Sequence, residues 1–535
     1  MKTMISSIIL ASCLALPLAS CSDSDVAPEQ KDWSTTTYFY SADAAMQDTY
    51  YKPTVGYVGD PMPFFDPVAG DFKVLYLQDF RPNPEGTYHP IWGVSTKDAA
   101  HYTSLGELVS CGTKKSQDAA IGTGSTIYDE SSKLYYTFYT GNKYLPTGDE
   151  SAQAVMVATS SDFKTWTKDR TFLLKGQDFG YDKTDFRDPF VFKGDDGKFH
   201  MLVSTKKGGK GSLAEFVSDD LKNWTDNGVF MTMMWDRFYE CPDLFKMGDY
   251  WYLVYSEIHH AIRRVQYFKG RTLDELKACT ANDAGRWPDA HEGFLDSRGL
   301  YAGKTASDGT NRYLWGWCPT RSGKDNTAVG ASPAEPEWGG NLVCYKLIQH
   351  EDGTLTLGQV DAVSEKYNQD VAVEVKESQN MTEADGTYTL AGNVEQPDAY
   401  MLMGRLGNHN KISFTVTTTN EWDKFGISMV RGSDSKKYYT MVVNPENEND
   451  RKINFEEQGV EGKGFIAGID GYVFARPADN VYNITIYTDN SICVMYINDV
   501  CSYTNRIYGI QKNCWSIDSF NGASVKVSNL KISQY

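Results

Sequence analysis

Short apolar runs separated by polar turns fill most of this chain, and segments with the apolar period of a long helix are almost absent. Up to about residue 350 these runs recur as a unit of roughly sixty residues, in which an apolar strand, an acidic turn and an aromatic strand follow one another. The copies start at Phe64, Ile127, Phe190, Asp243 and Leu300. Units of this length are typical of propeller blades. We therefore predict a five-bladed β-propeller over residues 50–350.

The pattern changes after the predicted propeller. We predict a linker over residues 351–372. Beyond it, apolar and polar residues alternate in regular short strands, which is typical of a β-sandwich, and we place this domain at residues 373–535. The fold class is thus expected to be all-β, with a short helix near Leu273 to Cys279.

The first residues have the features of a targeting signal. Lys2 supplies a positive charge, and Met4 to Leu18 form an apolar stretch too short to span a bilayer as an ordinary membrane helix. The stretch ends in Leu-Ala-Ser-Cys, which resembles a bacterial lipobox with lipid attachment at Cys21. We expect a lipoprotein signal peptide over residues 1–20 and a tether over residues 21–49. An ordinary signal peptide with a chance cysteine is the alternative.

The tether begins with Ser-Asp-Ser-Asp. This composition resembles the surface-export signal of Bacteroidetes lipoproteins, and it would equally suit a plain flexible tether. We expect a bacterial outer-membrane lipoprotein exposed on the cell surface, which contacts the membrane through its lipid anchor only. Surface glycan-uptake proteins are the partner class that this location implies.

Charge and aromatic content narrow the function. The net charge of −18 should repel nucleic acid and anionic membranes, so a neutral substrate is favoured. Aromatic residues make up 13% of the chain, which fits β-sheet cores and also fits sugar rings stacked on aromatic side chains.

The cysteines do not predict a metal site. Of the ten, Cys13 and Cys21 belong to the signal region, and the others form no C-x-x-C pair and have no histidine at ligand spacing. We therefore predict no metal and no cofactor. Cys493 and Cys501 could face each other across a hairpin as a disulfide, or they could be buried free thiols on strands.

Three acidic residues stand at the entry to repeated strands, each followed at once or one residue later by a proline. They are Asp60 in Gly-Asp-Pro, Asp188 in Arg-Asp-Pro and Glu240 in Glu-Cys-Pro. A single aspartate before proline often caps a turn. Three at the entry of the strand that lines a propeller axis are expected to converge at one mouth of the channel. Paired carboxylates are the groups that cleave a glycosidic bond.

The motifs around these acids resemble those of glycoside hydrolase family 32, the fructan hydrolases and invertases. Arg-Asp-Pro at Asp188 and Glu-Cys at Glu240 are intact, whereas the family's W-x-N-D-P-N-G becomes Tyr-Val-Gly-Asp-Pro-Met-Pro around Asp60, without its Trp, Asn and final Gly. Other matching segments are Leu75-Tyr76-Leu77-Gln78, Trp92-Gly93-Val94-Ser95, Gly124-Ser125, Tyr139-Thr140-Gly141-Asn142, Leu300-Tyr301-Ala302 and Trp315-Gly316-Trp317. The resemblance implies a five-bladed propeller followed by a β-sandwich.

The same resemblance implies roles for the three acids. Asp60 matches the nucleophile of a retaining glycosidase, Glu240 the acid/base, and Asp188 the residue that stabilises the transition state. Arg187 is expected to keep Asp188 ionised and to contact the sugar.

Further positions match the family's sugar-binding residues. Gln78, Trp92 and Thr123 correspond to positions that hold fructosyl hydroxyls or stack on a ring. Trp317 and Trp338 are additional candidates, and a role in the core is an equal alternative for either of them.

The expected activity is hydrolysis of β-fructosidic bonds in a fructan. An endo-acting levanase is favoured, because a tethered surface enzyme is most useful on a polymer too large to import. An exo-acting β-fructosidase or inulinase is the nearest alternative, and a fructosyltransferase would share every catalytic residue. Two others are a non-catalytic surface glycan-binding lipoprotein and an arabinan or xylan hydrolase of the related family 43.

Overall fold

The computed structural model describes a large part of the chain, with gaps. The described ranges are residues 49–80, 89–233, 238–257, 264–281, 293–321, 336–431, 437–447, 452–460, 465–466 and 473–535. The predicted signal peptide, the lipid-attachment residue Cys21 and all of the predicted tether except Thr49 lie outside these residues. No helix in the described ranges is long and apolar enough to cross a membrane.

Strands that follow one another in the first two thirds of the chain pair as successive antiparallel meanders. The first meander holds β1 (Tyr57–Asp66), β2 (Asp71–Asp79), β3 (Ile91–Thr96) and β4 (Thr103–Val109), and the second holds β5 (Ala120–Asp129), β6 (Leu134–Asn142), β7 (Gln153–Ser160) and β8 (Thr167–Lys168). The third holds β9 (Phe186–Lys193), β10 (Phe199–Lys207), β11 (Lys210–Ser218) and β12 (Thr225–Thr232), after the short 3-10 helix Gly176–Phe179.

Two more meanders complete this region. One holds β13 (Glu240–Met247), β14 (Tyr250–Glu257) and β15 (Arg264–Gly270), followed by helix α1 (Leu273–Ala281). The next holds β16 (Tyr301–Ser307), β17 (Arg312–Arg321), β18 (Pro336–Gln349) and β19 (Leu355–Gly358). The short helix expected near Leu273 is therefore confirmed.

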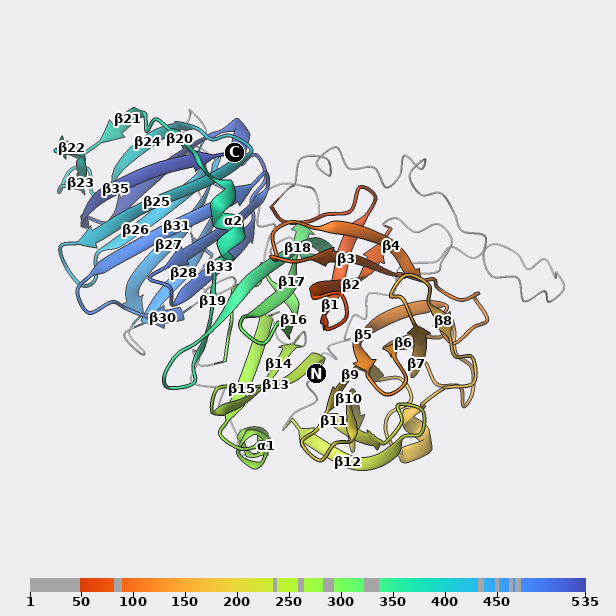
Figure 1. Cartoon of the computed structure of the whole chain (residues 1–535). Coiled ribbons are helices and arrows are strands. Elements are labelled where there is room, and N and C mark those ends of the chain that lie inside the picture. The colour runs from red at the N-terminus through yellow and green to blue at the C-terminus, as the bar shows by residue number, and fades with distance from the viewer. Residues whose placement is uncertain are drawn as a thin grey trace. The chain divides into compact units, whose positions relative to one another are not determined.

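The first strands of the meanders form a closed ring. β1 contacts β5, β5 contacts β9, β9 contacts β13, β13 contacts β16, and β16 contacts β1 (Figure 1). A single bridge from Val58 to Gly340 also joins β1 to β18, so the last meander pairs with the first. Equivalent ends of the five first strands are therefore brought together around one axis.

The predicted linker 351–372 contains three ordered elements, of which the last is strand β20 (Gln369–Val371). β19 pairs with β18, and helix α2 (Asp361–Lys366) follows it. The chain then enters two further sheets.

The remaining strands form two sheets. One has the order β22-β23-β35-β25-β31-β32-β33 with β20 on β35, and the other has the order β21-β24-β34-β26-β27-β28-β29 with β30 on β28. Their bounds are β20 (Gln369–Val371), β21 (Val375–Gln379), β22 (Met381–Ala384), β23 (Thr387–Ala391), β24 (Ala399–Arg405), β25 (His409–Thr418), β26 (Lys424–Arg431), β27 (Lys437–Asn447), β28 (Lys452–Val460), β29 (Phe465–Ile466), β30 (Val473–Ala475), β31 (Val481–Asp489), β32 (Ile492–Ile497), β33 (Cys501–Arg506), β34 (Cys514–Phe520) and β35 (Ser524–Gln534), with a short 3-10 helix at Ile510–Lys512.

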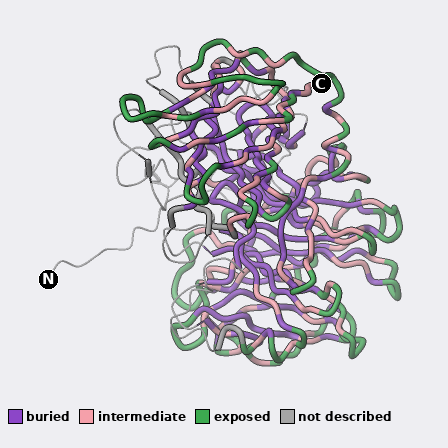
Figure 2. Tube along the Cα trace, turned by 90° about the vertical axis from the view of Figure 1, so that its left-hand side faces the viewer, coloured by how far each residue is buried: buried purple, intermediate pink, exposed green. Residues whose placement is uncertain are grey.

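These two sheets share one hydrophobic core. Ile412 on β25 and Val527 on β35 come from the first sheet, and Ile427 on β26 and Trp515 on β34 come from the second. Buried and partly exposed residues alternate strictly along β25, as expected for a strand with one face in the core. Figure 2 shows buried residues inside the sheets and exposed residues mainly at the turns.

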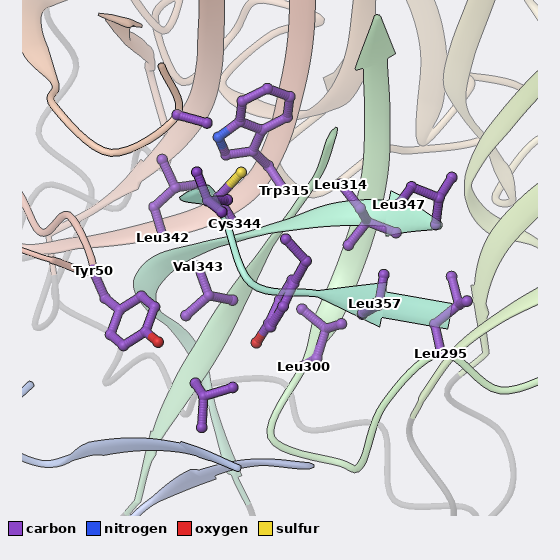
Figure 3. Packing of buried hydrophobic residues seen from close by; sticks show 14 of the residues in the cluster. Tyr50, Leu295, Leu300, Leu314, Trp315, Leu342, Val343, Cys344, Leu347 and Leu357 are labelled. Carbon is purple, nitrogen blue, oxygen red and sulfur yellow. The ribbon is translucent and has the colours of Figure 1, made fainter. Parts of the chain in front are cut away.

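Strand β32 is buried on both faces. Cys493, Met495 and Ile497 belong to the core between the two sheets. The alternate residues Ile492 and Val494 belong to a second cluster (Figure 3), which also contains Leu342, Val343 and other residues of the β17–β18 meander. One face of this strand therefore packs on the ring of meanders.

The structure decides the question of Cys493 and Cys501. Across the β32–β33 pair, Cys493 lies opposite Asn505 and Cys501 lies opposite Ile497. Both cysteines are free and buried. The prediction of buried thiols is confirmed, and the two residues do not face each other as a disulfide requires.

Candidate active site

The first strand of each meander carries a β-bulge at one shared level. On β1 the pairing with β2 shifts between Gly59 and Met62, and corresponding shifts interrupt β5, β9, β13 and β16. The bulges open, in strand order, at Asp60, Thr123, Asp188, Cys241 and Ala302. Bulges recur beside active sites because they redirect a side chain away from the regular ladder. The ring therefore presents five irregular positions at one end.

Three of these positions hold a strained backbone. The φ angle is 57° at Asp188, 51° at Cys241 and 53° at Ala302. Non-glycine residues rarely adopt the left-handed region, and they stay there only where surrounding contacts hold them. Strain of this kind collects at functional sites, so the bulge level is the first candidate for a site.

Glu240 lies one residue ahead of its bulge. It has the register of Arg187 on β9 and Tyr301 on β16, whereas Asp60 and Asp188 occupy the following level. The expectation of equivalent positions therefore holds for the two aspartates, and Glu240 is offset from them by one residue. The offset places Glu240 beside the side chains of Arg187 and Tyr301.

Asp60 accepts hydrogen bonds from two other strands. Thr123 Oγ1 donates to its Oδ2 at 2.5 Å, and the indole Nε1 of Trp317 donates to its Oδ1 at 3.1 Å. Thr123 and Trp317 are buried, so the core holds both donors in place. Donors on both oxygens stabilise a carboxylate, which is the form that a nucleophile requires.

Glu240 lies between a cation and a phenol. Arg187 Nη2 is 3.1 Å from Oε1 of Glu240, and the hydroxyl of Tyr301 donates to Oε2. Arg187 also pairs with Asp185 at 2.7 Å, and its guanidinium lies 3.8 Å from the centre of the Phe238 ring. Burial alone would lower the pKa of Arg187, but the surrounding carboxylates raise it above its ordinary value.

Asp188 is more deeply buried than the other two acids. Its Oδ2 accepts a hydrogen bond from the backbone N–H of Cys241 at 2.9 Å. Burial raises the pKa of Asp188 to about 7, although Arg187 and the Cys241 N–H act in the opposite direction. Arg187 favours the ionised form of Asp188, but desolvation of the carboxylate outweighs the effect of the guanidinium.

Two threonines connect the acids. Thr140 Oγ1 donates to the carbonyl of Thr123 and accepts the backbone N–H of Asp188, both at 2.9 Å. Thr123, which donates to Asp60, also has its Oγ1 3.9 Å from the sulfur of Cys241. The three carboxyl groups thus belong to one connected cluster. Glu240 joins it through the next residue, Cys241, which contacts both Asp188 and Thr123.

Lys304 is a buried cation near this cluster that the sequence motifs did not reveal. Its Nζ donates to the carbonyl of Gly124 at 2.8 Å and lies 5.3 Å from the centre of the Phe190 ring. Burial lowers the pKa of Lys304, while nearby carboxyls, among them Asp188, oppose that effect. A lone lysine in an apolar strand was the available signal. Tyr301 was also given no role, although it lies in a matched motif.

The predicted sugar-binding residues fall into two groups, those that contact the acids and those that do not. Gln78 on β2 is fully buried, and its Nε2 donates to the carbonyl of Val55. Trp92 on β3 packs edge to face on Phe80, with ring centres 5.8 Å apart. Among the described residues, these two make no hydrogen bond or ring contact with the acids, whereas Thr123, Arg187 and Trp317 each bond one of the acids directly.

Trp338 occupies the space beside Gly59. A Cβ added at Gly59 would lie 2.1 Å from an atom of the Trp338 ring. The ring stacks on His89 with centres 4.1 Å apart and lies 6.1 Å from the Trp317 ring. Position 59 is where the motif of the resembling family has asparagine, so a tryptophan from another strand fills the place of that side chain.

Within the described ranges, no group of three or more His, Cys, Asp or Glu residues is arranged to hold a metal ion. The groups gathered at the cluster include the three carboxyl groups, the guanidinium of Arg187 and the phenol of Tyr301.

The raised pKa of Asp188 predicts a pH-dependent gain in stability on its removal. The unfolded chain ionises this group near pH 4 and the folded protein near pH 7, so stability falls as pH rises between these values, by on the order of 4 kcal/mol at most. Asp188→Asn cannot ionise. We expect its melting temperature to exceed that of the wild type at pH 8 and to match it at pH 4. An equal difference at both pH values would contradict the assignment.

The packing of Trp338 on Gly59 predicts a coupled pair. Gly59→Ala should lower the free energy of unfolding by about 1–3 kcal/mol, because its Cβ collides with the ring. The same change in a Trp338→Ala background should cost much less, which denaturant unfolding of the four variants measures. Gly404→Ala, whose Cβ meets only ordinary contacts from 3.6 Å, is the matched control. Equal costs in both backgrounds would show that the two residues are independent.

Two family models match the chain. The model "Glycosyl hydrolases family 32 N-terminal domain" matches residues 50–360, and the model "GH32, BT1760-like, C-terminal domain" matches residues 353–532. The first model alone spans more than half of the chain.

Individual relatives are distant. A β-fructofuranosidase, insoluble isoenzyme CWINV2, of Arabidopsis thaliana is 26% identical over 310 residues, which are 52% of this chain and 50% of that protein. The chain spans about half the length of the curated relatives that it matches first.

Solved structures match over nearly the whole chain. Fructan 1-exohydrolase IIa of Cichorium intybus has a TM-score of 0.68 at 15% identity, covering 92% of this chain and 98% of that one. Sucrose-6-phosphate hydrolase of Lactobacillus gasseri has a TM-score of 0.66 at 18% identity, covering 92% and 95%. At identities below 20%, these matches establish only the fold, which is a β-propeller with a β-sandwich. By the family models, the chain belongs to glycosyl hydrolase family 32.

Proposed function

We propose that this protein is a retaining glycoside hydrolase that cleaves β-fructosidic bonds. The observation that carries the proposal is the connected cluster of Asp60, Asp188 and Glu240 at the bulge level of the ring. Membership of family 32 and the names of its relatives support a fructoside as the substrate.

Asp60 and Glu240 divide the chemistry between them. Asp60 attacks the anomeric C2 of the fructosyl unit and forms a covalent ester, while Glu240 donates its proton to the departing glycosidic oxygen. Glu240 then takes a proton from water, whose oxygen attacks C2 and releases Asp60. The hydrogen bonds from Thr123 and Trp317 hold Asp60 for its attack, and those from Arg187 and Tyr301 orient Glu240.

Asp188 contributes through the sugar. Its carboxyl group, held by the backbone N–H of Cys241, is positioned to hydrogen-bond fructosyl hydroxyls. In its ionised form it stabilises positive charge as the bond to the leaving group lengthens. Arg187 orients Glu240 and can contact the same sugar.

The finer proposal is an endo-acting levanase, which cleaves β-2,6-fructan. A surface-tethered enzyme gains most from cutting a polymer that is too large to import, and this argument supports the endo mode. Trp338 fills the space beside Gly59, where the family motif has asparagine. Exo-acting β-fructosidases and inulinases remain the main alternative, since relatives include a fructan 1-exohydrolase.

The domain plan and location are part of the same proposal. The five meanders are the blades of a propeller over residues 50–350, followed by a linker at 351–372 and a β-sandwich at 373–535. Residues 1–20 are a signal peptide, and Cys21 carries a lipid that anchors the enzyme through a tether at 21–49. The tethered enzyme is exposed at the cell surface, with glycan-uptake proteins as neighbours.

The roles of Asp60 and Glu240 predict a large loss of turnover. Asp60→Asn and Glu240→Gln should each lower kcat by orders of magnitude with little change in melting temperature, because each retains shape and removes the reacting carboxyl. Glu215→Gln, a buried carboxyl on β11 that pairs with His200, is the matched control and should keep its activity. Near-normal kcat in either catalytic variant would overturn the assignment.

The mode of action predicts a product profile. We expect the protein without residues 1–21 to release oligosaccharides of several lengths from levan early in the reaction, and little from inulin, as resolved by chromatography over time. Fructose as the only early product would make the enzyme exo-acting. Transfer products at high sucrose would indicate a fructosyltransferase. Activity on arabinan or xylan alone would favour a family 43 chemistry, and binding without turnover a glycan-binding lipoprotein.

A further inference from the structure

Arg506 is a buried cation at the end of β33, in the sandwich. Its side chain makes four hydrogen bonds within the described structure. Nε donates to the carbonyl of Pro319 at 3.0 Å, and Nη2 donates to the carbonyl of Cys318 at 2.9 Å and to Asn341 Oδ1 at 2.6 Å. Nη1 donates to Ser491 Oγ at 2.9 Å. Three of these four acceptors belong to β17 and β18.

All four acceptors are neutral oxygens. A buried guanidinium costs several kcal/mol in desolvation, and a carboxylate partner usually offsets part of that cost. Here the hydrogen bonds of Arg506 recorded within the described ranges go to two carbonyls, an amide and a hydroxyl. An apolar residue would fill the space between β33 and the β17–β18 pair with a smaller desolvation penalty. What the guanidinium of Arg506 adds is several N–H donors in a fixed, forked arrangement.

The two carbonyls lie where the β17–β18 ladder becomes irregular. Its register shifts between Pro319 and Arg321, and Pro319 has no N–H to give to the ladder. Cys318 O also lies so close to Gly340 that a Cβ there would be 1.8 Å away. Arg506 therefore bonds β17 at a point where strand pairing alone holds it weakly.

The same point leads directly to the candidate active site. Cys318 follows Trp317, whose indole donates to Asp60. On the facing strand, Gly340 bridges to Val58 on β1 and lies two residues after Trp338, whose ring covers Gly59. Trp317 is therefore adjacent to Cys318, whose carbonyl accepts a hydrogen bond from Arg506. Trp338 is two residues from Gly340, which pairs with Pro319, the other carbonyl bonded by Arg506.

We propose that Arg506 is a positioning residue: it fixes strands β17 and β18 from the sandwich side so that Trp317 holds Asp60 in its reactive orientation. The inference rests on the proposed function of Asp60 and extends it, because it gives the sandwich a part in catalysis. The hydrophobic cluster that includes residues of β32 and β18 brings the domains together (Figure 3). Arg506 adds hydrogen bonds from β33 to β17 and β18 across the same contact.

The test compares two variants of Arg506 with a junction control. Arg506→Met removes the cation, and Arg506→Lys keeps the charge but loses the fork. Asp296→Asn is the control, because Asp296 is buried and accepts hydrogen bonds from Ser502 and Thr504 on the same strand β33. Initial rates on levan are measured at 25 °C together with melting temperatures, and rates are divided by the folded fraction.

We expect both Arg506 variants to lose at least tenfold in kcat with less than threefold change in KM, since the reacting carboxylate is disturbed and most sugar contacts are kept. Asp296→Asn should lower the melting temperature and leave kcat per folded molecule unchanged. Wild-type kcat per folded molecule in Arg506→Lys would overturn the proposal, as would an equal loss in the Asp296 control. If Arg506→Met does not fold, Arg506→Lys decides the result.

A second readout does not depend on activity. Cys318 is fully buried between Trp317 and Pro319, and its alkylation by iodoacetamide can be followed by mass spectrometry of the peptide. We expect faster alkylation of Cys318 in both Arg506 variants than in the wild type and in Asp296→Asn. Unchanged protection would overturn the positioning role. A wild type inactive on levan, inulin and sucrose would instead overturn the proposed function, so the two failures are distinguishable.

Discussion

Closure of the ring through β1, β5, β9, β13 and β16 is the constraint on which the rest of this structure depends. Each first strand must break its ladder at the same level, and the bulges there release side chains toward a common region. Asp60 and Asp188 are distant in sequence, yet they become neighbours because their strands are equivalent members of one ring. A site built in this way inherits its precision from the sheets and not from loops.

Carboxylates that lie close together repel one another, and the three acids differ in the donors and the burial that surround them. Asp60 receives donors on both oxygens, and Glu240 receives a guanidinium and a phenol. Asp188 has a single backbone N–H and deep burial, which raises its pKa to about 7. Three similar groups are therefore held in three different environments, and burial dominates at Asp188.

The sandwich is tied into the same region. One face of β32 packs against residues of the last meander, and Arg506 reaches the backbone beside Trp317. Trp317 in turn bonds Asp60. The first motif has Gly59 where the family has asparagine, and Trp338 from the distant strand β18 fills the space of the missing side chain. Motifs that look local in sequence are thus completed by residues from other strands.

Sequence alone determined the strand repeats, the three acids and the family, because strand periodicity and short motifs such as Arg-Asp-Pro are local properties of the chain. Only the tertiary structure decided that Glu240 is offset by one residue, that Arg187 pairs with Glu240 and Asp185, and that burial governs Asp188. The burial of Gln78, the place of Lys304 and the contact of Trp338 with Gly59 were also beyond sequence. These depend on strand register and on contacts between blades, where a shift of one residue changes every neighbour.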